Sequence, residues 1–216
     1  MRLRNKKWTK DYIKDNLKYM IKIKKKINVD KLFIKKQDTY LEIGCGKGKF
    51  IIEQAIKNKD KNFIAMEKET TVVGVALKKA ITTENFDLAN LLFLNKFAEN
   101  LLDIFENNSI SGIFLNFLDP WPKFKNFKKR LTYIDFLNIY WDLLKDNGVI
   151  EIKTDNDKLY EFSLEQIAKS KFKLIYNTNN LYFEKKLLKD NIATEYEEKF
   201  CSLGKNINKI VIKKEL

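Results

Sequence analysis

Residues 39–50 read TYLEIGCGKGKF, an apolar run followed by three glycines within five positions. Glycine adopts backbone conformations that other residues avoid, so Gly44, Gly46 and Gly48 predict a turn whose backbone can approach a ligand closely. A turn of this kind after a strand is typical of open α/β sheets, which bind ligands at the carboxyl ends of their strands. The spacing G-x-G-x-G differs by one residue from the dinucleotide fingerprint G-x-G-x-x-G. The stretch therefore predicts an α/β fold with a ligand at this turn.

Outward from this turn, apolar runs of strand length alternate with segments of helical pattern. The expected strands are 39–44, 62–67, 90–95, 112–118 and 148–153, and the expected helices are 48–58, 70–83, 98–106 and 130–145. This alternation predicts a mostly parallel sheet with helices on both faces. Two later runs, 172–177 and 209–214, are expected to add antiparallel strands at one edge, which makes seven strands in all.

The ends of the elements carry their own signals. Gly148 stands where a glycine after a helix is expected, and Thr154 with Asp155 stands where a helix N-cap is expected. Residues 178–205 show no clear period, which indicates a long functional or mobile loop. Residues 1–37 are rich in lysine and predict a basic N-terminal arm, so the main domain is expected to cover 38–216.

The charge balance points to a polyanionic partner. The chain has 42 Lys and Arg against 29 Asp and Glu, a formal net charge of +13. Such an excess commonly marks proteins that bind polyanions, and nucleic acid is the first candidate. Lys, Ile, Asn and Phe are abundant together, so an AT-rich genome explains part of the excess equally well, although it does not explain local clusters.

Several classes of chemistry are excluded by composition. The chain has no histidine and two cysteines, Cys45 and Cys201. Ser-His-Asp catalysis, Cys-His catalysis and a Cys/His zinc site are therefore ruled out, and no metal is expected. Two cysteines are too few for a disulfide scaffold, which favours reducing cytosol. No apolar segment follows the basic start, and no run approaches the roughly 18 apolar residues of a membrane span, so we expect a soluble cytoplasmic protein.

Two acids flank the glycine turn. Glu67 ends the second expected strand, 23 residues after Gly44, where a carboxylate can accept hydrogen bonds from ribose hydroxyls. This placement suits a nicotinamide dinucleotide and S-adenosylmethionine equally. Glu42, just before the glycines, favours a cationic ligand over a pyrophosphate. The alternative is that Glu42 caps or faces solvent and Glu67 is an ordinary surface acid.

The two prolines of the chain flank one tryptophan in Asp119-Pro120-Trp121-Pro122, at the end of the fourth expected strand. Proline fixes its own φ and restricts the residue before it, so this tetrapeptide predicts a stiff loop at the ligand crevice. A fixed acid beside a flat aromatic ring suits a nucleobase. The alternative is a prolyl turn with Trp121 in the core. Five cations that can hold phosphates follow within eight residues: Lys123, Lys125, Lys128, Lys129 and Arg130.

With these motifs in place, the chain resembles the bacterial tRNA (guanine-N7-)-methyltransferases. The matching stretches are MRLRNKKW, LEIGCGKGKF, FIAMEK, LNFLDPWPK with KKRLTY, IKTDN and TEYEEKFCSLG, which span 1–204 in family order. The resemblance implies a Rossmann-like class I methyltransferase that moves a methyl group from S-adenosyl-L-methionine to N7 of guanosine 46 in the tRNA variable loop. It also implies a monomer or homodimer.

The resemblance also implies roles for individual residues. Glu42, Gly44, Gly46, Glu67 and Asp119 would surround the cofactor, and Asp119 would be catalytic. The guanosine would be bound by Lys123, Asp155, Thr194, Glu195, Tyr196 and Glu197. RNA would be contacted by Lys125, Asn126, Phe127, Lys128, Lys129 and Arg130, with Arg2, Arg4, Lys6 and Lys7 as a second clamp.

One position departs from the family pattern. The family usually carries an acid-alanine pair after the third strand, and here LNKFAENL places Phe97 where the acid is expected. A phenyl ring cannot accept a hydrogen bond from the adenine amino group. The contact is therefore expected from the backbone at this position, or from Asn95 or Glu99.

Three other functions compete with this interpretation. A methyltransferase acting on exocyclic base amines shares an acid followed by proline and an aromatic residue, but its loop usually lacks the Trp-Pro-Lys continuation and the TEYEEKF block. A non-catalytic RNA-binding protein with a degenerate fold is conceivable because of Phe97, although the full set of acids argues against it. A dehydrogenase is the weakest alternative, given the glycine spacing and the absence of histidine.

Overall fold

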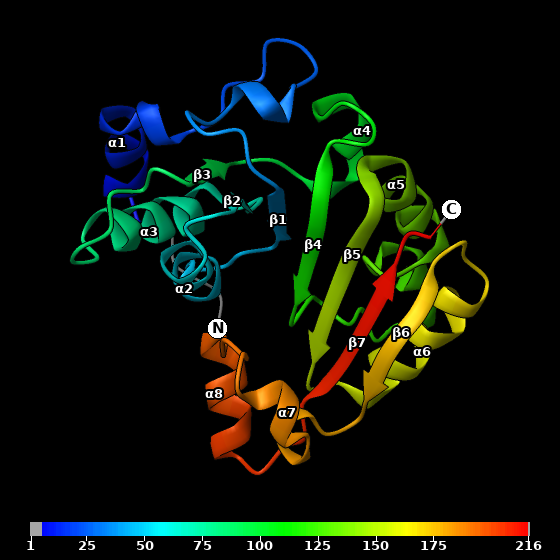
Figure 1. Ribbon diagram of the computed structural model, residues 1–216. Coiled ribbons are helices and arrows are strands. Elements are labelled where there is room, and N and C mark those ends of the chain that lie inside the picture. The colour runs from blue at the N-terminus through cyan, green and yellow to red at the C-terminus, as the bar shows by residue number, and fades with distance from the viewer. Residues whose placement is uncertain (1–5, 216) are drawn as a thin grey trace.

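The computed structural model describes residues 6–215 and contains one seven-stranded sheet in the order β3-β2-β1-β4-β5-β7-β6 (Figure 1). The strands are β1 Thr39–Ile43, β2 Asn62–Met66, β3 Leu91–Leu94, β4 Ile110–Asn116, β5 Leu144–Thr154, β6 Lys173–Thr178 and β7 Asn208–Lys213. Strands β1 to β5 pair in parallel, and β7 lies antiparallel between β5 and β6. The predicted fold class and the two antiparallel strands are confirmed.

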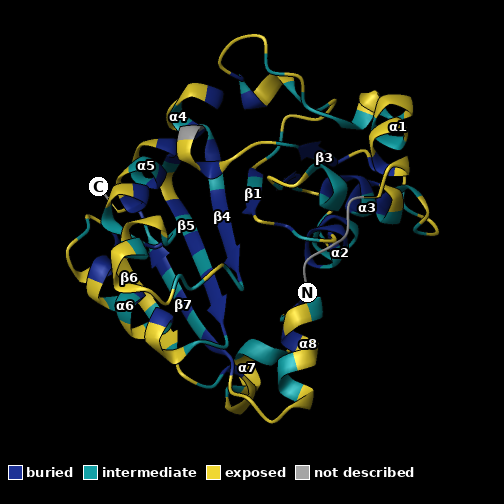
Figure 2. Cartoon of the chain, turned by 180° about the vertical axis from the view of Figure 1, so that it is seen from behind, coloured by how far each residue is buried: buried dark blue, intermediate teal, exposed yellow. Residues whose placement is uncertain are grey.

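Helices cover both faces of this sheet. One face carries α2 (Lys49–Lys57) and α3 (Thr70–Ile81), and the other carries α4 (Leu101–Ile104), α5 (Ile134–Leu143) and α6 (Asp157–Ala168). Side chains alternate along the strands, so Leu115 packs toward α4–α6 while Phe114 packs toward α2 and α3. Burial follows this layering, with the strands buried and the outer sides of the helices exposed (Figure 2).

The strand order reverses between β1 and β4, the point at which open α/β sheets bind their ligands. The carboxyl ends of β4 and β5 point toward a small lobe that contains α7 (Lys185–Leu188) and α8 (Glu195–Ser202) (Figure 1). The lobe also contains the 3-10 turn η5 (Leu181–Phe183). The prediction that 178–205 forms a long loop is therefore wrong.

Two predicted helix ends are wrong: Gly148 does not follow a helix, and Thr154 with Asp155 does not form an N-cap. Helix α5 ends at Leu143, because Leu144 is extended and begins β5, so Gly148 lies inside a strand and caps nothing. The left-handed residue of this connection is Asn147, with φ of +63°, and its backbone N–H donates to the carbonyl of Lys214 at 3.0 Å. Helix α6 is capped by Asn156, whose side chain accepts from the Leu159 N–H at 2.9 Å.

Two of the expected helices are shorter than predicted. The segment 98–106 contains a 3-10 turn, η3 (Ala98–Asn100), and one turn of α-helix, α4. The segment 130–145 is helical only from Ile134, because 124–129 forms the separate 3-10 helix η4 (Phe124–Lys129) and Arg130 is extended. Apolar spacing marked both regions correctly, but backbone hydrogen bonds with the neighbouring loops set their ends.

The basic N-terminal segment packs against the domain where the structure describes it. Helix α1 (Trp8–Asp15) lies on α3, and the approach is so close that a Cβ on Gly74 would lie 2.5 Å from the Cβ of Thr9. The Ile21 N–H donates to the carbonyl of Phe93 in β3 at 2.8 Å, and the Ile27 N–H donates to the carbonyl of Ile104 in α4 at 2.7 Å. The 3-10 turns η1 (Leu17–Tyr19) and η2 (Val29–Lys31) complete this segment. Arg2 and Arg4 lie outside the described residues, and the boundary at residue 37 stays a prediction.

No helix between residues 6 and 215 has both the length and the apolar character that crossing a membrane requires.

Candidate functional site

The glycine turn is fastened to the end of β2. Backbone N–H groups of Gly44 and Cys45 donate to the carbonyl of Met66 at 2.8 and 3.0 Å. The Gly46 N–H donates to Oε2 of Glu67 at 3.2 Å. Gly44 and Gly46 have φ of +78° and +55°, which favours glycine, and a Cβ on Gly46 would meet no atom within 4 Å. The turn is therefore held firmly while its backbone at Gly46 faces open space.

Polar side chains form a row on the α2 side of the sheet, beside this turn. Glu42 of β1, Asn116 of β4 and Lys153 of β5 are all nearly completely buried, and Asn116 and Lys153 are direct neighbours in the strand register. The Asn116 amide donates to Oε1 of Glu42 at 2.9 Å. Buried polar residues in adjacent strands at the switch point mark this row as a site, because burial of such groups is costly for stability alone.

Two oxygen atoms of this row have no hydrogen-bond partner among the described residues: Oε2 of Glu42 and Oδ1 of Asn116. Buried polar atoms are nearly always paired in folded proteins, so two adjacent acceptors indicate a donor that comes from a ligand. Burial raises the pKa of Glu42 to about 7, an effect that the Asn116 hydrogen bond and the positive charge of Lys153 oppose. A cationic donor would restore the carboxylate form. These two acceptor oxygens fit the ammonium end of S-adenosylmethionine, which donates.

Lys153, which no sequence motif predicted as a site residue, connects this row to the C-terminal lobe. Its ammonium donates to Oε2 of Glu197 at 2.7 Å, to the carbonyl of Ile192 at 2.8 Å and to Oδ1 of Asn191 at 2.9 Å. Burial lowers the pKa of Lys153, and the adjacent carboxylate of Glu197 opposes this shift. The available signal was a lysine at the end of the strand-like run GVIEIK, since lysine is rarely buried without a partner.

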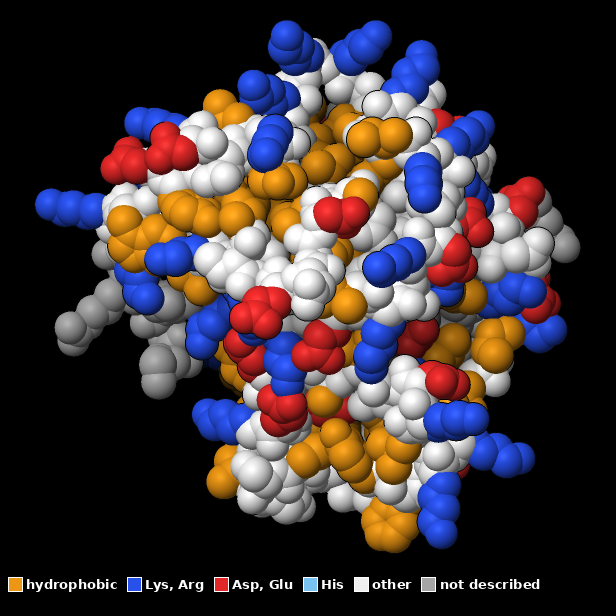
Figure 3. All heavy atoms as spheres, turned by 60° about the vertical axis from the view of Figure 1, so that its left-hand side comes forward, with side chains coloured by type: hydrophobic (Ala, Val, Ile, Leu, Met, Phe, Trp, Pro, Cys, Tyr) orange, Lys and Arg blue, Asp and Glu red, His pale blue; other side chains and the backbone are white. Residues whose placement is uncertain are grey.

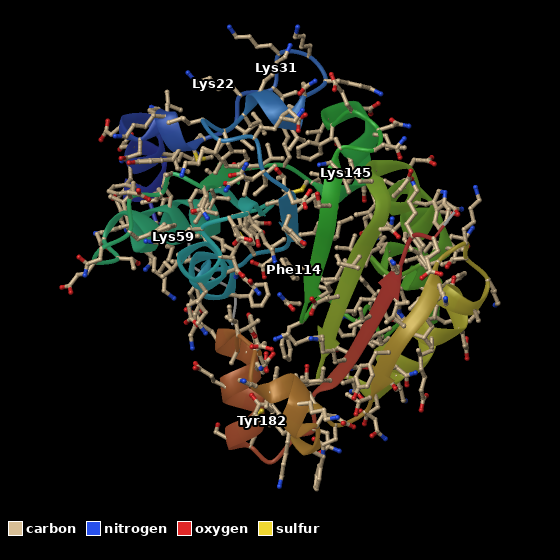
Figure 4. All side chains as sticks on the ribbon, viewed as in Figure 1. Lys22, Lys31, Lys59, Phe114, Lys145 and Tyr182 are labelled. Carbon is tan, nitrogen blue, oxygen red and sulfur yellow. The ribbon has the colours of Figure 1, made fainter. Side chains whose placement is uncertain are left out.

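Glu197 therefore lies inside the lobe. It also forms a capping box with Thr194: the Glu197 N–H donates to Oγ1 of Thr194 at 2.9 Å, and the Thr194 N–H donates back to Glu197 at 3.3 Å. The hydroxyl of Tyr182, labelled in Figure 4 on the lobe, donates to Oε1 of Glu197 at 3.2 Å. Two residues predicted to bind substrate, Thr194 and Glu197, thus fix the start of α8 against the sheet.

Ion pairs join α8 to the glycine-turn side of the molecule. Glu195 pairs with Lys79 of α3 at 3.0 Å and with Lys47 of the glycine turn at 3.9 Å. Glu198 pairs with Lys49 at the start of α2. Figure 3 shows this face, where acidic and basic side chains gather between its upper and lower parts. The lobe is thereby placed beside the carboxyl edge of the sheet.

Phe97, which stands where the family usually has an acid, is 49% exposed to solvent. The amide of Asn95 donates to the carbonyls of Glu67 and Lys68, both at 2.9 Å, and its oxygen accepts from the Thr70 hydroxyl at 2.8 Å. Both amide hydrogens are thus used to connect the ends of β2 and β3. Asn95 shapes this part of the crevice, and its oxygen keeps a second lone pair.

Lys68 lies between two of the predicted site residues. Its ammonium is 5.3 Å from the ring centroid of Phe97 and 3.7 Å from Oδ2 of Asp119. The side chain of Asp119 is 72% exposed, so this carboxylate faces the open crevice at the end of β4. A ligand that reaches Asp119 would meet the ammonium of Lys68 as well.

The loop around Asp119 is strained and braced. Phe117 and Trp121 have φ of +50° and +42°, which is uncommon for bulky residues and is found at functional sites. The guanidinium of Arg130 donates to the carbonyls of Pro120 and Trp121 at 2.9 and 3.3 Å. Arg130 therefore holds the loop from behind, in addition to any contact with RNA.

The remaining predicted substrate and RNA residues lie around this loop. Asp155 follows β5 and pairs with Lys205 at 3.2 Å. Lys123, Lys125, Lys128 and Lys129 are exposed, and Asn126 and Phe127 are half-buried. Phe127 packs edge-on against Tyr133 with ring centroids 5.3 Å apart. The structure thus presents one short basic helix, η4, next to the acid-lined crevice.

Other features do not provide a competing centre. A cavity of about 400 Å³ lies between the end of α2 and residues 85–90, at the amino ends of β2 and β3, where open α/β sheets do not bind ligands. Among residues 6–215, no group of three His, Cys, Asp or Glu side chains is arranged to hold a metal ion. Burial raises the pKa of the Cys45 thiol, which leaves it unreactive.

Comparison with known proteins gives the family. The family model described as "Putative methyltransferase" matches residues 36–210. The chain is 56% identical to the tRNA (guanine-N(7)-)-methyltransferase of Mesoplasma florum and 51% identical to that of Mycoplasma capricolum subsp. capricolum. Each alignment covers 99% of both chains.

Solved structures support the fold at much lower identity. The chain superposes on "Structure of an Antibiotic Related Methyltransferase" with a TM-score of 0.61 and 17% identity, covering 92% of this chain and 98% of that one. It superposes on the 16S rRNA methyltransferase KamB with a TM-score of 0.61 and 14% identity, covering 83% and 89%.

Proposed function

Because this chain belongs to the tRNA (guanine-N7-)-methyltransferase family, we propose that it transfers the methyl group of S-adenosyl-L-methionine to N7 of guanosine 46 in the variable loop of tRNA. The observation that carries the proposal is the pair of unpartnered buried oxygens on Glu42 and Asn116, beside the open backbone of Gly46. A buried carboxyl oxygen next to an amide oxygen suits a cationic hydrogen-bond donor, and the sulfonium cofactor carries an ammonium group at one end.

The remaining cofactor contacts follow the edge of the sheet. Glu67 accepts two backbone N–H bonds and keeps lone pairs for ribose hydroxyls. Phe97 and Asn95 lie at the end of β3, where the resemblance places the adenine ring. The exposed phenyl face of Phe97 offers stacking in place of the hydrogen bond that an acid would accept. A solved neighbour with a TM-score of 0.53, a phosphoethanolamine N-methyltransferase from Haemonchus contortus, is described in complex with S-adenosyl-L-methionine.

The reaction requires little acid-base chemistry from the protein. The cofactor supplies a methyl group whose bond to sulfur breaks with the electron pair left on sulfur, while the N7 lone pair forms the new bond. N7 carries no proton, so no general base is needed, and the chain has no histidine. The residues of the crevice then act mainly by holding the base in line with the methyl group, which contributes several kcal/mol in comparable reactions.

Asp119 and Asp155 have different roles beside the purine. Positive charge passes to the purine ring as N7 is methylated, and a carboxylate near the ring stabilises that charge. Asp119 is exposed to the crevice, whereas Asp155 is mostly covered and paired with Lys205. We assign the stabilising role to Asp119 and the recognition of the guanine N1–H and amino group to Asp155 and Glu195.

RNA is held by the basic helix η4 beside the crevice. Its cations would bind phosphates on both sides of a guanosine that is turned out of the folded tRNA, at a cost of a few kcal/mol that these contacts offset. We also propose a cytoplasmic location, which a tRNA substrate supports. Lys6 and Lys7, at the start of the described chain, would add a second contact with the RNA.

Incubation with labelled S-adenosylmethionine and unmodified tRNA, followed by chemical cleavage at 7-methylguanosine, tests this function. The proposal expects one cleavage site, at position 46. Cleavage at another guanosine would contradict only the proposed tRNA position. A label found in N6-methyladenosine would contradict the proposed base, guanine, and the proposed atom, N7.

A further inference from the structure

Three aromatic rings meet at the mouth of the crevice. Phe117 follows β4, and Tyr196 and Phe200 lie one turn apart on α8. Their ring centroids are separated by 6.3, 6.1 and 6.2 Å, and the ring planes differ by only 22–24°. In a stacked column the outer two rings would be twice as far apart as neighbours. Equal separations therefore mean that the three rings form a compact triangular cluster with nearly parallel planes, not a linear column.

Lys153 holds both parts of this cluster in place. Its carbonyl accepts the Phe117 N–H at 2.8 Å, which fixes Phe117 in its left-handed conformation. Its ammonium binds Glu197, which lies between Tyr196 and Phe200 in the α8 sequence. A buried ion pair thus positions rings from two segments that are about 80 residues apart in the chain. Strain at Phe117 that is maintained by surrounding structure is typical of a binding site.

The cluster is accessible and attracts cations. Tyr196 is 49% exposed, and Phe117 and Phe200 are half-buried. The ammonium groups of Lys205 and Lys199 lie 5.0 and 5.8 Å from the ring centroid of Phe200. Within the described chain no cation lies over the rings of Phe117 or Tyr196, and the exposed part of Tyr196 can be reached by a ligand. Asp119 is two residues beyond Phe117.

We propose that Phe117, Tyr196 and Phe200 form a stacking platform for the target purine, and that the platform binds the cationic, N7-methylated base more tightly than the neutral one. This inference rests on the proposed function. Aromatic faces carry negative electrostatic potential and attract cations, and bases stack on such rings whatever their sequence. Because the purine becomes positively charged as the methyl group arrives, the same rings stabilise the transition state along with the product.

The test uses two synthetic tRNAs that differ only by a methyl group on N7 of guanosine 46. Wild-type protein should bind the methylated tRNA about tenfold more tightly, the scale of a cation–π contact in a partly desolvated site. Tyr196→Leu and Phe117→Leu should reduce this ratio toward one. Tyr196→Phe, which keeps the ring and loses only the hydroxyl, should retain the wild-type ratio and serves as the matched control.

Single-turnover rates provide a second readout that a purely structural role would not change in the same way. The leucine variants should methylate tRNA about tenfold more slowly, with affinity for unmodified tRNA within about twofold of wild type, since phosphate contacts dominate that affinity. A wild-type ratio of one, or a ratio unchanged in Tyr196→Leu, would overturn the platform. If Phe117→Leu does not fold, the affinity ratio of Tyr196→Leu alone decides the test, because Tyr196 is exposed. Failure of wild-type protein to methylate guanosine N7 would instead overturn the proposed function.

Discussion

The ammonium of Lys153 and the carboxylate of Glu197 lie 2.7 Å apart with side chains 3% and 0% exposed. Lys153 belongs to the central sheet, and Glu197 belongs to the C-terminal lobe that closes one side of the crevice. A charged pair in such a place is rarely the most stable choice, because well-packed apolar residues are often as good or better. Here the ion pair fixes the position of the lobe. It holds the lobe, with its aromatic rings, against the ends of β4 and β5.

Replacing one partner of this pair should be costly. Lys153→Met leaves a buried carboxylate without a cation, so we expect the free energy of unfolding to fall by about 3–5 kcal/mol. Urea unfolding followed by circular dichroism measures this change. The double variant Lys153→Met with Glu197→Gln should recover part of the loss, because it removes the unpaired charge.

The control for this prediction is an exposed pair of similar geometry. Lys173 and Glu215 lie 2.8 Å apart with side chains 62% and 36% exposed. Lys173→Met should cost less than about 1 kcal/mol. A loss of the same size in both single variants would contradict the special role of the buried pair.

Cofactor affinity should depend on pH through Glu42. Burial raises the pKa of this carboxyl to about 7, so the free protein carries it mostly protonated below that pH. Binding a cationic ligand requires the carboxylate, and affinity for S-adenosylmethionine should therefore rise about tenfold per pH unit from pH 5.5 toward 7 and then level off. Calorimetry across this range should show proton release, and Glu42→Gln should bind weakly with little pH dependence.

The same pKa shift affects stability with the opposite trend. The folded-state pKa of Glu42 lies above its ordinary value of 4.5, so the folded protein holds the proton more tightly than the unfolded chain. Stability from this group is fully present below about pH 4.5 and is lost as the pH rises to about 7. Without ligand, Glu42→Gln should be more stable than wild type at pH 8 in thermal unfolding. Equal stability at pH 8 would show that Glu42 is not buried without its ligand.

Asp119→Ala should remove most activity and leave the fold intact. Loss of one group that stabilises transition-state charge typically slows turnover about 10²- to 10³-fold. The side chain is exposed, so the free energy of unfolding should change by no more than about 0.5 kcal/mol. Asp11→Ala on α1 is a matched control, since Asp11 is 76% exposed and pairs only loosely with Lys14. Near-normal turnover of Asp119→Ala would contradict the catalytic assignment.

Removal of three cations from η4 should weaken tRNA binding in a salt-dependent way. Each phosphate contact adds about 0.7 to 0.9 to the slope of log affinity against log salt. The variant Lys125→Gln, Lys128→Gln, Lys129→Gln should therefore show a slope lower by about 2 to 3, measured by filter binding between 50 and 200 mM salt.

A variant with the same change in net charge separates local contacts from overall attraction. Lys24, Lys25 and Lys26 are exposed on the loop opposite the crevice, between the labelled Lys22 and Lys31 (Figure 4). Their replacement by glutamine should leave the slope within about one unit of wild type. Equal losses in both triple variants would show that net charge, not the η4 helix, attracts the tRNA.

The arrangement of the sheet could be predicted because its signals are local and repeated. Every strand in the sheet corresponds to an apolar run, and glycines after the first run locate the crevice. The ends of α5 and α6 could not be predicted, because they depend on a left-handed Asn147 and on the side chain of Asn156, and neither differs from a loop asparagine in sequence alone. The hydrogen bond of Asn147 to Lys214 is a tertiary contact, and the bond of Asn156 to Leu159 is a local cap.

The site was predictable in part for the same reason. Glu42, Gly46 and Asp119 follow from short motifs, and the structure brings them to one edge of the sheet. The roles of Lys153 and Phe200 depend on contacts between segments that are far apart in the chain, so no local motif predicts them. The lobe that contains α8 has too little apolar character to show a helical period, since it is stabilised by an ion pair and a capping box.

The central claim is that N7 of one tRNA guanosine accepts the methyl group. Methyl transfer to a tRNA with 7-deazaguanosine at position 46 tests it at a single atom, because carbon replaces the nitrogen and carries no lone pair while the rest of the base keeps its shape. With labelled S-adenosylmethionine, unmodified tRNA should incorporate one methyl group and the 7-deaza tRNA should incorporate none. Equal incorporation into both tRNAs would contradict the account.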